Sequence, residues 1–197
     1  MKRLLLLALI TGNLFTATAQ QKTYSVGKIK TNKGEILIWL YDETPNHKAS
    51  FIKLANAHYW DSLTFNRVIK DFVAQGGCPD TPEGFSNSPY LLKPEIISKL
   101  RHVYGAVAAG QDGNKEKISA GCQFYIVQNK QGLPRLDDNY TVFGFVFKGM
   151  DVVDNIVSVK KDATDKPFDD ITLNVRIVSM TESELKKNGF DRTQIQK

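Results

Sequence analysis

The sequence predicts an all-β fold, a barrel or sandwich of short strands capped by a few helices. Apolar and polar residues alternate with period two in many short runs, which is typical of half-buried strands. Turns rich in Gly, Asn and Pro separate these runs. Only two or three segments have helical spacing, and many short strands with so few helices favour a barrel or sandwich.

Residues 1–19 are expected to be a secretory signal peptide, not part of this fold. Met1–Arg3 is positively charged, Leu4–Ile10 is apolar, and 17–19 is a small-residue cleavage site. The apolar run is far shorter than the roughly 20 residues that span a bilayer, although an uncleaved anchor is the alternative. We therefore expect export to the periplasm, or secretion, without a stable membrane anchor.

The formal net charge of the whole chain is +5, and two of its positive charges, Lys2 and Arg3, lie in residues 1–19. The chain beyond that segment is therefore only mildly basic. Its cations are scattered among acids, without the basic stripe that nucleic-acid binding needs. Cys78 and Cys122 are the only cysteines in the sequence, and they could form one disulfide in an exported protein. Their spacing alone leaves that pairing open. No His, Asp or Glu cluster near them suggests a zinc site.

A single domain is expected over residues 20–180, and its best-defined local element is a hairpin. Tyr24–Thr31 and Glu35–Tyr41 alternate as two strands. The segment 32–34, Asn-Lys-Gly, forms the turn, where Gly is available for a positive φ.

A helix is predicted directly after this hairpin. Thr44 suits the N-cap and Pro45 suits the first helical position. An apolar face with helical spacing continues to Ala55. His47 and His58 have no carboxylate at motif spacing, so we interpret both as surface or boundary residues.

Residues 65–77 hold two short alternating runs around a charged turn and end in Gly-Gly. Phe65, Arg67 and Ile69 fall on one parity, which would place Arg67 on a face with bulky apolar residues. An Arg in such surroundings needs a partner, and Gln75 could accept from it and donate elsewhere. The alternative is a surface Arg on an edge strand.

The rest of the domain is expected to alternate loops and strands. The predicted segments are an irregular proline-rich loop at 78–102, strands at 103–110, 122–128, 141–147 and 171–177, polar loops at 111–120 and 133–139, and a short helix at 149–156. Residues 181–197 form a polar C-terminal extension. Thr181 and Glu184 have capping-box spacing, which predicts a short helix, and the tail after Gly189 is expected to be polar and mobile.

Several common chemistries are absent from the sequence. It has no P-loop, no Gly-x-Gly-x-x-Gly and no nucleophile elbow. The adjacent carboxylates of Asp137 and Asp138 lie in a loop and look like turn residues. An enzyme with this sequence must work without covalent catalysis or metal, and no cofactor is expected.

Three motifs together resemble the cyclophilins, the cyclophilin-type peptidyl-prolyl isomerases. Residues 65–77 resemble their signature, Gly121–Ile126 their second motif, and Val142–Val146 with Gly149–Val153 their third. Order and spacing agree over about 26–179. The resemblance implies a closed eight-stranded antiparallel barrel capped by two α-helices, and the activity of a peptidyl-prolyl cis–trans isomerase.

The resemblance also implies the residues of the site. Arg67 would be the catalytic donor, and Gln75 would orient it. The substrate-binding positions would be Phe72, Val73, Gly110, Gln111, Gln123, Tyr125, Leu136 and Tyr140.

The sequence departs from the family pattern near this site. Asn66 stands where many members carry His, and Cys78 stands where Asp is common. Arg135 occupies the position at which cyclosporin-sensitive members have Trp, and residues 109–111 lack the usual Met. We therefore expect weak cyclosporin binding.

The leading interpretation is an exported prolyl isomerase, monomeric, that assists the folding of proline-containing client polypeptides. The alternative is a non-catalytic binding module for proline-containing segments. A structural barrel with a vestigial pocket is a third reading, which the intact Arg67 and Gln75 disfavour.

Overall fold

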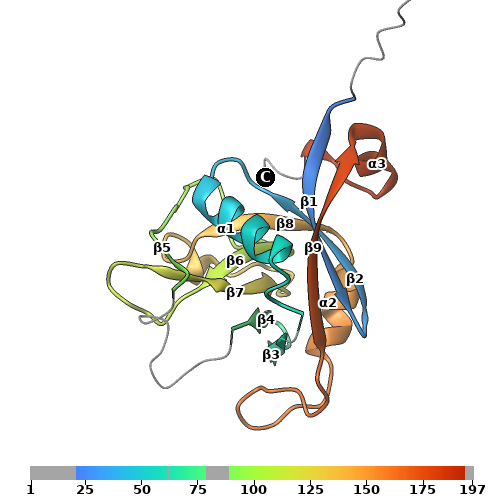
Figure 1. The fold of residues 1–197 in the computed structure, drawn as a ribbon. Coiled ribbons are helices and arrows are strands. Elements are labelled where there is room, and N and C mark those ends of the chain that lie inside the picture. Colours follow the sequence, from blue (N-terminus) through green and yellow to red (C-terminus); the bar gives the residue numbers. More distant parts are fainter. Residues whose placement is uncertain (1–20, 62, 79–88, 194–197) are drawn as a thin grey trace, which may run out of the picture.

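A closed antiparallel barrel is formed by the described residues of the computed structural model, which are 21–61, 63–78 and 89–193 (Figure 1). Its strands follow one another in the order β4, β3, β9, β1, β2, β8, β6 and β7, and β7 pairs back onto β4. The predicted eight-stranded barrel is thereby confirmed. The predicted signal segment lies outside the described residues.

The strands and helices have the following bounds: β1 Thr23–Thr31, β2 Gly34–Leu40, α1 Pro45–Asn56, β3 Leu63–Ile69, β4 Val73–Gly77, β5 Leu91–Leu92, β6 Ala106–Gly110, β7 Ser119–Val127, β8 Val142–Lys148, α2 Met150–Val157, β9 Thr172–Thr181 and α3 Glu182–Lys187. The short β5 pairs with β7 outside the closed ring. Of the helices in the described residues, none is both long and apolar enough to cross a membrane.

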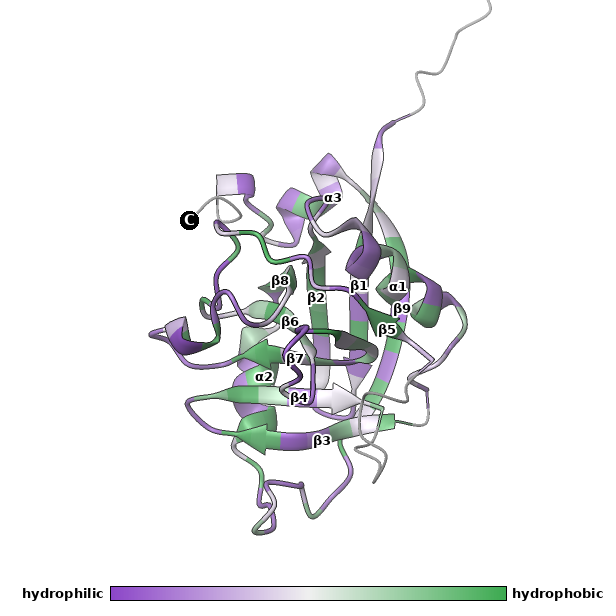
Figure 2. Cartoon of the chain, turned by 90° about the vertical axis from the view of Figure 1, so that its left-hand side faces the viewer, coloured by the Kyte–Doolittle hydropathy of each residue, from purple (hydrophilic) through white to green (hydrophobic). Residues whose placement is uncertain are grey.

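The predicted hairpin is formed by β1 and β2. Ile29 lies opposite Ile36, and Thr31 lies opposite Gly34. Gly34 has a φ of +139°, a conformation that favours glycine. Hydrophobic and hydrophilic residues alternate along β1 and β9 (Figure 2), so one face of each strand supplies the core.

The hydrophobic core fills the barrel, and α1 and α2 cover it from two sides (Figure 1). Phe51 of α1 contacts the rings of Trp60 and Phe124, with ring centroids 5.1 and 5.8 Å apart. Val153 and Ile156 of α2 are fully buried in the same cluster. Burial of each large apolar side chain stabilises the fold by about 1.5–3 kcal/mol.

His47 is buried, so its interpretation as a surface or boundary residue is wrong. Its side chain lies in α1, and the residue is 2% exposed. Nδ1 of its ring lies 2.6 Å from Glu95 Oε2, and Nε2 lies 2.7 Å from Ser119 Oγ. These partners are remote in sequence, which is why no local motif revealed them. His58, in contrast, is exposed as expected.

Glu95 caps α1 from the proline-rich loop. Its carboxylate accepts from the backbone N–H groups of Asn46 and His47, at 3.0 and 2.9 Å. Thr44 occupies the predicted N-cap position, but its side chain makes no capping hydrogen bond. A negative charge at a helix N-terminus is favourable, so Glu95 joins the loop to the helix.

Cys78 and Cys122 form a disulfide, which resolves the pairing that their spacing left open. Their Cα atoms are 5.3 Å apart, because Gly77 at the end of β4 lies opposite Gln123 of β7. Gly77 has a φ of +114°, which allows the chain to leave the sheet beside the disulfide.

The C-terminal segment packs on the barrel beyond the predicted domain. The capping box of α3 is present: Thr181 Oγ1 accepts from the N–H of Glu184, and the Glu184 carboxylate accepts from the N–H of Thr181. The expectation of a polar mobile tail after Gly189 is wrong at Phe190. This residue is 4% exposed, and its ring lies against Trp39 with centroids 4.5 Å apart.

Candidate active site

Three neighbouring strands place the site on the outer face of the barrel. Arg67 of β3 lies opposite Gln75 of β4, and Gln75 lies opposite Tyr125 of β7. Side chains directly opposite each other in a sheet share a face and touch. The alternate residues Ala74 and Phe124 point into the core.

A β-bulge in β3 turns Arg67 outward. The register shifts between Thr64 and Arg67, so that three steps along β3 correspond to two along β4. Such an extra residue reverses the alternation of side chains. Phe65 therefore points into the core, 1% exposed, while Arg67 points to the pocket. The prediction that these two residues share a face is wrong for this reason.

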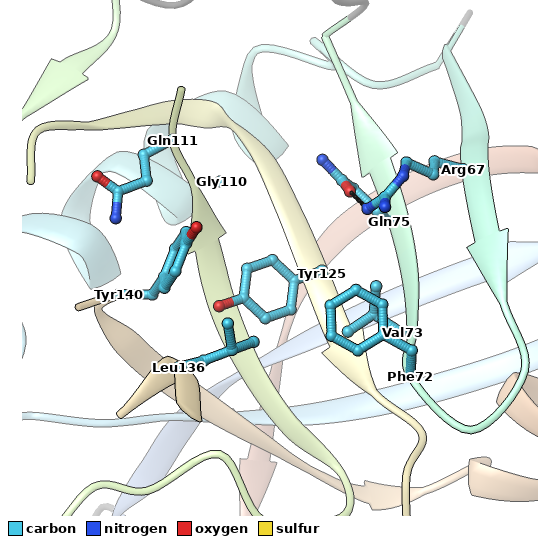
Figure 3. A pocket seen from close by; sticks show the side chains of 9 residues that line it. All are labelled: Arg67, Phe72, Val73, Gln75, Gly110, Gln111, Tyr125, Leu136 and Tyr140. Atoms are coloured by element: carbon cyan, nitrogen blue, oxygen red, sulfur yellow. Dashed lines mark hydrogen bonds between the residues drawn. The ribbon is translucent and has the colours of Figure 1, made fainter. Parts of the chain in front are cut away.

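The outer face carries a pocket of about 140 Å³ (Figure 3). Arg67 and Gln75 turn toward each other on one side, Gln111 and Tyr140 lie on the opposite side, and the Tyr125 ring lies between them. The lining residues are Arg67, Phe72, Val73, Gln75, Gly110, Gln111, Tyr125, Leu136 and Tyr140. These are all but one of the residues expected to form the site, and Gln123 lies behind Gln75.

A chain of hydrogen bonds fixes Arg67. Its guanidinium donates to Gln75 Oε1 at 3.0 Å. Gln75 Nε2 donates in turn to Gln123 Oε1 at 2.6 Å, and Gln123 Nε2 donates to the carbonyl of Cys78 at 3.2 Å. Gln123 is 1% exposed, so the far end of the chain is rigidly packed. Gln75 thus accepts from Arg67 and donates elsewhere, as its predicted partnership required.

A model of the family described as cyclophilin type peptidyl-prolyl cis-trans isomerase/CLD matches residues 26–182. The chain belongs to this family.

Individual relatives agree with the family match. A peptidyl-prolyl cis-trans isomerase of Arabidopsis thaliana is 31% identical over 148 residues, covering 74% of this chain and 88% of the relative. A Staphylococcus saprophyticus protein that carries the same activity in its name is 30% identical over 174 residues, covering 73% and 86%. The crystal structure of a Cryptosporidium parvum cyclophilin-type isomerase superposes with a TM-score of 0.68 at 26% identity, covering 81% and 99%. Peptidyl-prolyl isomerisation is thus the activity of this cyclophilin.

The apolar part of this cyclophilin's pocket is supported from behind by His102. Its Nε2 lies 2.9 Å from the Tyr125 hydroxyl, and its Nδ1 lies 2.8 Å from Asp137 Oδ1. The backbone N–H of His102 also donates to the Asp137 carboxylate, at 2.8 Å. Because Leu136 precedes Asp137, one imidazole holds two walls of the pocket in place.

Burial controls the protonation of this support. It lowers the pKa of His102, although the hydrogen bond to Asp137 acts in the opposite direction. Burial also raises the pKa of the Tyr125 phenol well above its usual value. At neutral pH the imidazole is therefore uncharged and the phenol keeps its proton, so the ring of Tyr125 offers an uncharged surface.

Sequence reasoning missed His102 and assigned Asp137 only to a turn. The two residues are far apart in the chain, and neither belongs to a motif. They meet because β6, β7 and the 3-10 helix Pro134–Leu136 converge at the pocket. No spacing rule could have paired them.

Proposed function

We propose that this cyclophilin isomerises X-Pro bonds in exported polypeptides and so assists their folding. The pocket beside Arg67 supports the part of the proposal that concerns proline. The basic, apolar and small-residue pattern of residues 1–19 supports the part that concerns export. We further propose that the domain spans 20–180, that it acts as a monomer, and that no membrane anchor is retained.

The reaction requires the amide to lose its planarity. Rotation costs about 18–20 kcal/mol because resonance between the carbonyl and the nitrogen is broken. No covalent bond forms or breaks, so the protein needs only to bind the twisted amide more tightly than either planar form.

Arg67 is proposed to provide this difference in binding. As the amide twists, the lone pair of the prolyl nitrogen localises and becomes a hydrogen-bond acceptor. Arg67 directs one N–H to Gln75, and its guanidinium carries further N–H donors for the substrate. A donor held in advance, next to an apolar surface, stabilises such developing charge more than solvent does.

The rest of the pocket is proposed to hold the prolyl ring and the peptide backbone. Phe72, Val73, Leu136 and Tyr125 supply an apolar recess of suitable size. A second Cryptosporidium parvum cyclophilin structure was determined in the presence of the dipeptide Ala-Pro, which supports proline-containing substrates here. Gly110 and Gln111 line the opposite edge, where an extended peptide could run.

The observation that carries the proposed mechanism is the hydrogen-bond chain that fixes Arg67 at the mouth of the pocket. Its test is a protease-coupled isomerisation assay on an Ala-Pro peptide. We expect Arg67→Ala to lower kcat/KM by about 100-fold or more, the usual cost of losing such a donor. Arg67→Lys should also be strongly impaired, because Lys lacks the planar fork.

Arg176→Ala is the matched control, because Arg176 pairs with Asp61 at the surface and does not line this pocket. It should keep wild-type activity. Equal activity of Arg67→Ala and wild type would refute the role of Arg67. Peptide binding without any acceleration by the wild type would instead support the binding-module alternative.

The export proposal needs a separate measurement. The full chain should be expressed in a bacterial host, and the periplasmic fraction should contain a protein whose mass corresponds to cleavage before Gln20. A protein found only in the cytoplasm with residues 1–19 intact would contradict export.

A further inference from the structure

A second hollow continues directly from the prolyl pocket. It has a volume of about 430 Å³ and shares Gln111, Leu136 and Tyr140 with the prolyl pocket. Its other lining residues come from the loop after β6 and from the segment around the 3-10 helix: Gly113, Asn114, Lys115, Lys117, Arg135 and Asn139. A peptide with its proline in the first pocket would therefore place a neighbouring side chain in the second.

Three cations, Lys115, Lys117 and Arg135, line this second hollow, and no Asp or Glu does. In the described part of the chain, no ion pair joins a carboxylate to any of the three. We call the hollow lined by these three residues the basic subsite.

Glu116 lies between the two lysines in the sequence, but it is exposed and does not line the hollow. Three other acids near the hollow in the sequence are engaged elsewhere. Asp138 pairs with Arg101 at 3.1 Å, and Asp137 bonds to His102 at 2.8 Å. Asp112 accepts from the side chain of Asn114 at 2.8 Å. The positive charge of the basic subsite therefore remains available to a ligand.

Arg135 brings this charge to the edge of the prolyl pocket. Its guanidinium carbon lies 4.7 Å from the centroid of the Phe72 ring, and that of Arg67 lies 5.9 Å from the same ring. One aromatic wall of the prolyl pocket thus contacts both guanidinium groups. A residue flanking the bound proline would meet Arg135 at short range.

The loops that carry the basic subsite are tied to each other. Gln111 Nε2 donates to the carbonyl of Asn139 at 2.8 Å, and Lys117 Nζ donates to the carbonyl of Asp138 at 2.7 Å. Asn114 bonds to both backbone groups of Ile118, each at 2.8 Å. The loops and the Lys117 ammonium are consequently held in place before a ligand arrives, which lowers the entropic cost of binding.

We propose that the basic subsite binds the carboxylate side chain of an Asp or Glu flanking the isomerised X-Pro bond. This inference rests on the proposed function, and it makes acidic, proline-containing segments the preferred clients. Arg135 and Lys117 are its specificity-determining residues. Arg135 can donate two parallel N–H hydrogen bonds to a carboxylate, and Lys117 adds a second positive charge.

The expected preference is moderate because the cations are partly solvated. Surface ion pairs are weak individually, and two or three together correspond to about a threefold to tenfold difference in kcat/KM. Salt should screen the effect, since the Debye length falls to about 3 Å at 1 M.

The test uses peptides of one length that contain Ala-Pro and carry Glu, Gln or Lys at one position, before the Ala or after the proline. Isomerisation by the mature chain is followed by two-dimensional exchange NMR at low and high salt. At one of the positions and at low salt, we expect kcat/KM to be highest for the Glu peptide, lower for the Gln peptide and lowest for the Lys peptide. Arg135→Gln and Lys117→Gln should each reduce these differences in kcat/KM between the peptides, and the double variant should abolish them.

Lys33→Gln is the matched control, because it removes the same charge from the exposed β1–β2 turn and should preserve the ranking. Equal kcat/KM for Glu, Gln and Lys peptides at every position, with the Gln peptide turned over, would overturn the basic subsite alone. If no peptide is turned over, the proposed function fails instead. Chemical-shift titrations then still test the basic subsite: it predicts that the Glu peptide binds more tightly than the Gln peptide, and equal affinities would overturn it.

Discussion

Tyr125 contributes its ring to the prolyl pocket and its hydroxyl to His102 behind the pocket. These two parts of one side chain have different physical roles. The ring supplies apolar contact for the substrate, whereas the hydroxyl satisfies a buried imidazole nitrogen. A substitution that removes only the hydroxyl can therefore separate stability from activity.

Tyr125→Phe should keep kcat/KM within about twofold, because the ring remains. It should lower the free energy of unfolding by about 1–3 kcal/mol, because His102 Nε2 loses its partner in a buried place. Denaturant titration and the isomerisation assay measure the two effects. Tyr104→Phe removes a hydroxyl that is hydrogen-bonded to Asp154 in a less buried place, so it should lower the free energy of unfolding by less than Tyr125→Phe does. A large loss of activity with unchanged stability would contradict this division of roles.

The strand pair β4–β7 combines the disulfide with the hydrogen-bond chain of the site. Cys78 is covalently joined to Cys122, and its carbonyl accepts from Gln123, the residue that orders Gln75. The two cysteines that the disulfide joins are 44 positions apart in the sequence. In the loop-entropy description, such a cross-link stabilises the fold mainly by restricting the unfolded chain.

The double variant Cys78→Ala/Cys122→Ala should lose about 2–4 kcal/mol of unfolding free energy. Its kcat/KM should fall only modestly, because β7 still pairs with β4 along the whole length of β4. Denaturant titration with and without a reductant provides the control: the reductant should destabilise the wild type and leave the double variant unchanged. Identical stability of oxidised and reduced wild type would show that the bond contributes nothing.

The molecule as a whole contains two buried histidines, and each uses both ring nitrogens. His47 connects α1 to Glu95 and Ser119, and His102 connects β7 to Asp137. Burial lowers the pKa of both imidazoles, and their hydrogen bonds to carboxylates only partly offset this. The pKa of Glu95 is also lowered: burial alone would raise it, but hydrogen bonds from His47 and from two backbone amides outweigh that effect.

These shifts predict that acidification destabilises the fold. Below about pH 6.5 the unfolded chain binds protons on these histidines, whereas the folded chain binds them only at lower pH. Protons therefore favour the unfolded state, at a cost of about 1.4 kcal/mol for each unit by which a pKa is lowered. Free energies of unfolding measured from pH 7.5 to pH 4.5 should fall steadily.

His58→Gln is the control for this pH dependence, since His58 is exposed. Nδ1 of the His58 ring lies 3.2 Å from Asp61 Oδ2 at the surface, where an ion pair is weak. The variant should therefore change the slope less than His47→Gln and His102→Gln, which should each make it shallower. Constant or rising stability on acidification would contradict the assignment of both histidines as buried and neutral.

The sequence determined the elements whose causes are local. Alternation and turn residues were enough to find the β1–β2 hairpin, Thr44 and Pro45 marked the start of α1, and the capping box marked α3. The three motifs of the family resemblance then supplied the closure of the barrel and the residues that line the pocket.

Only the tertiary structure decided the side-chain environments that depend on distant segments. The bulge in β3 separated Arg67 from Phe65, Glu95 buried His47, and His102 met Asp137 behind the pocket. The β1–β2 turn, by contrast, could be predicted from its own residues. Backbone preferences act between neighbours in the chain, whereas burial and hydrogen bonding depend on which strands are adjacent. That adjacency is fixed only when the barrel closes and β7 pairs with β4.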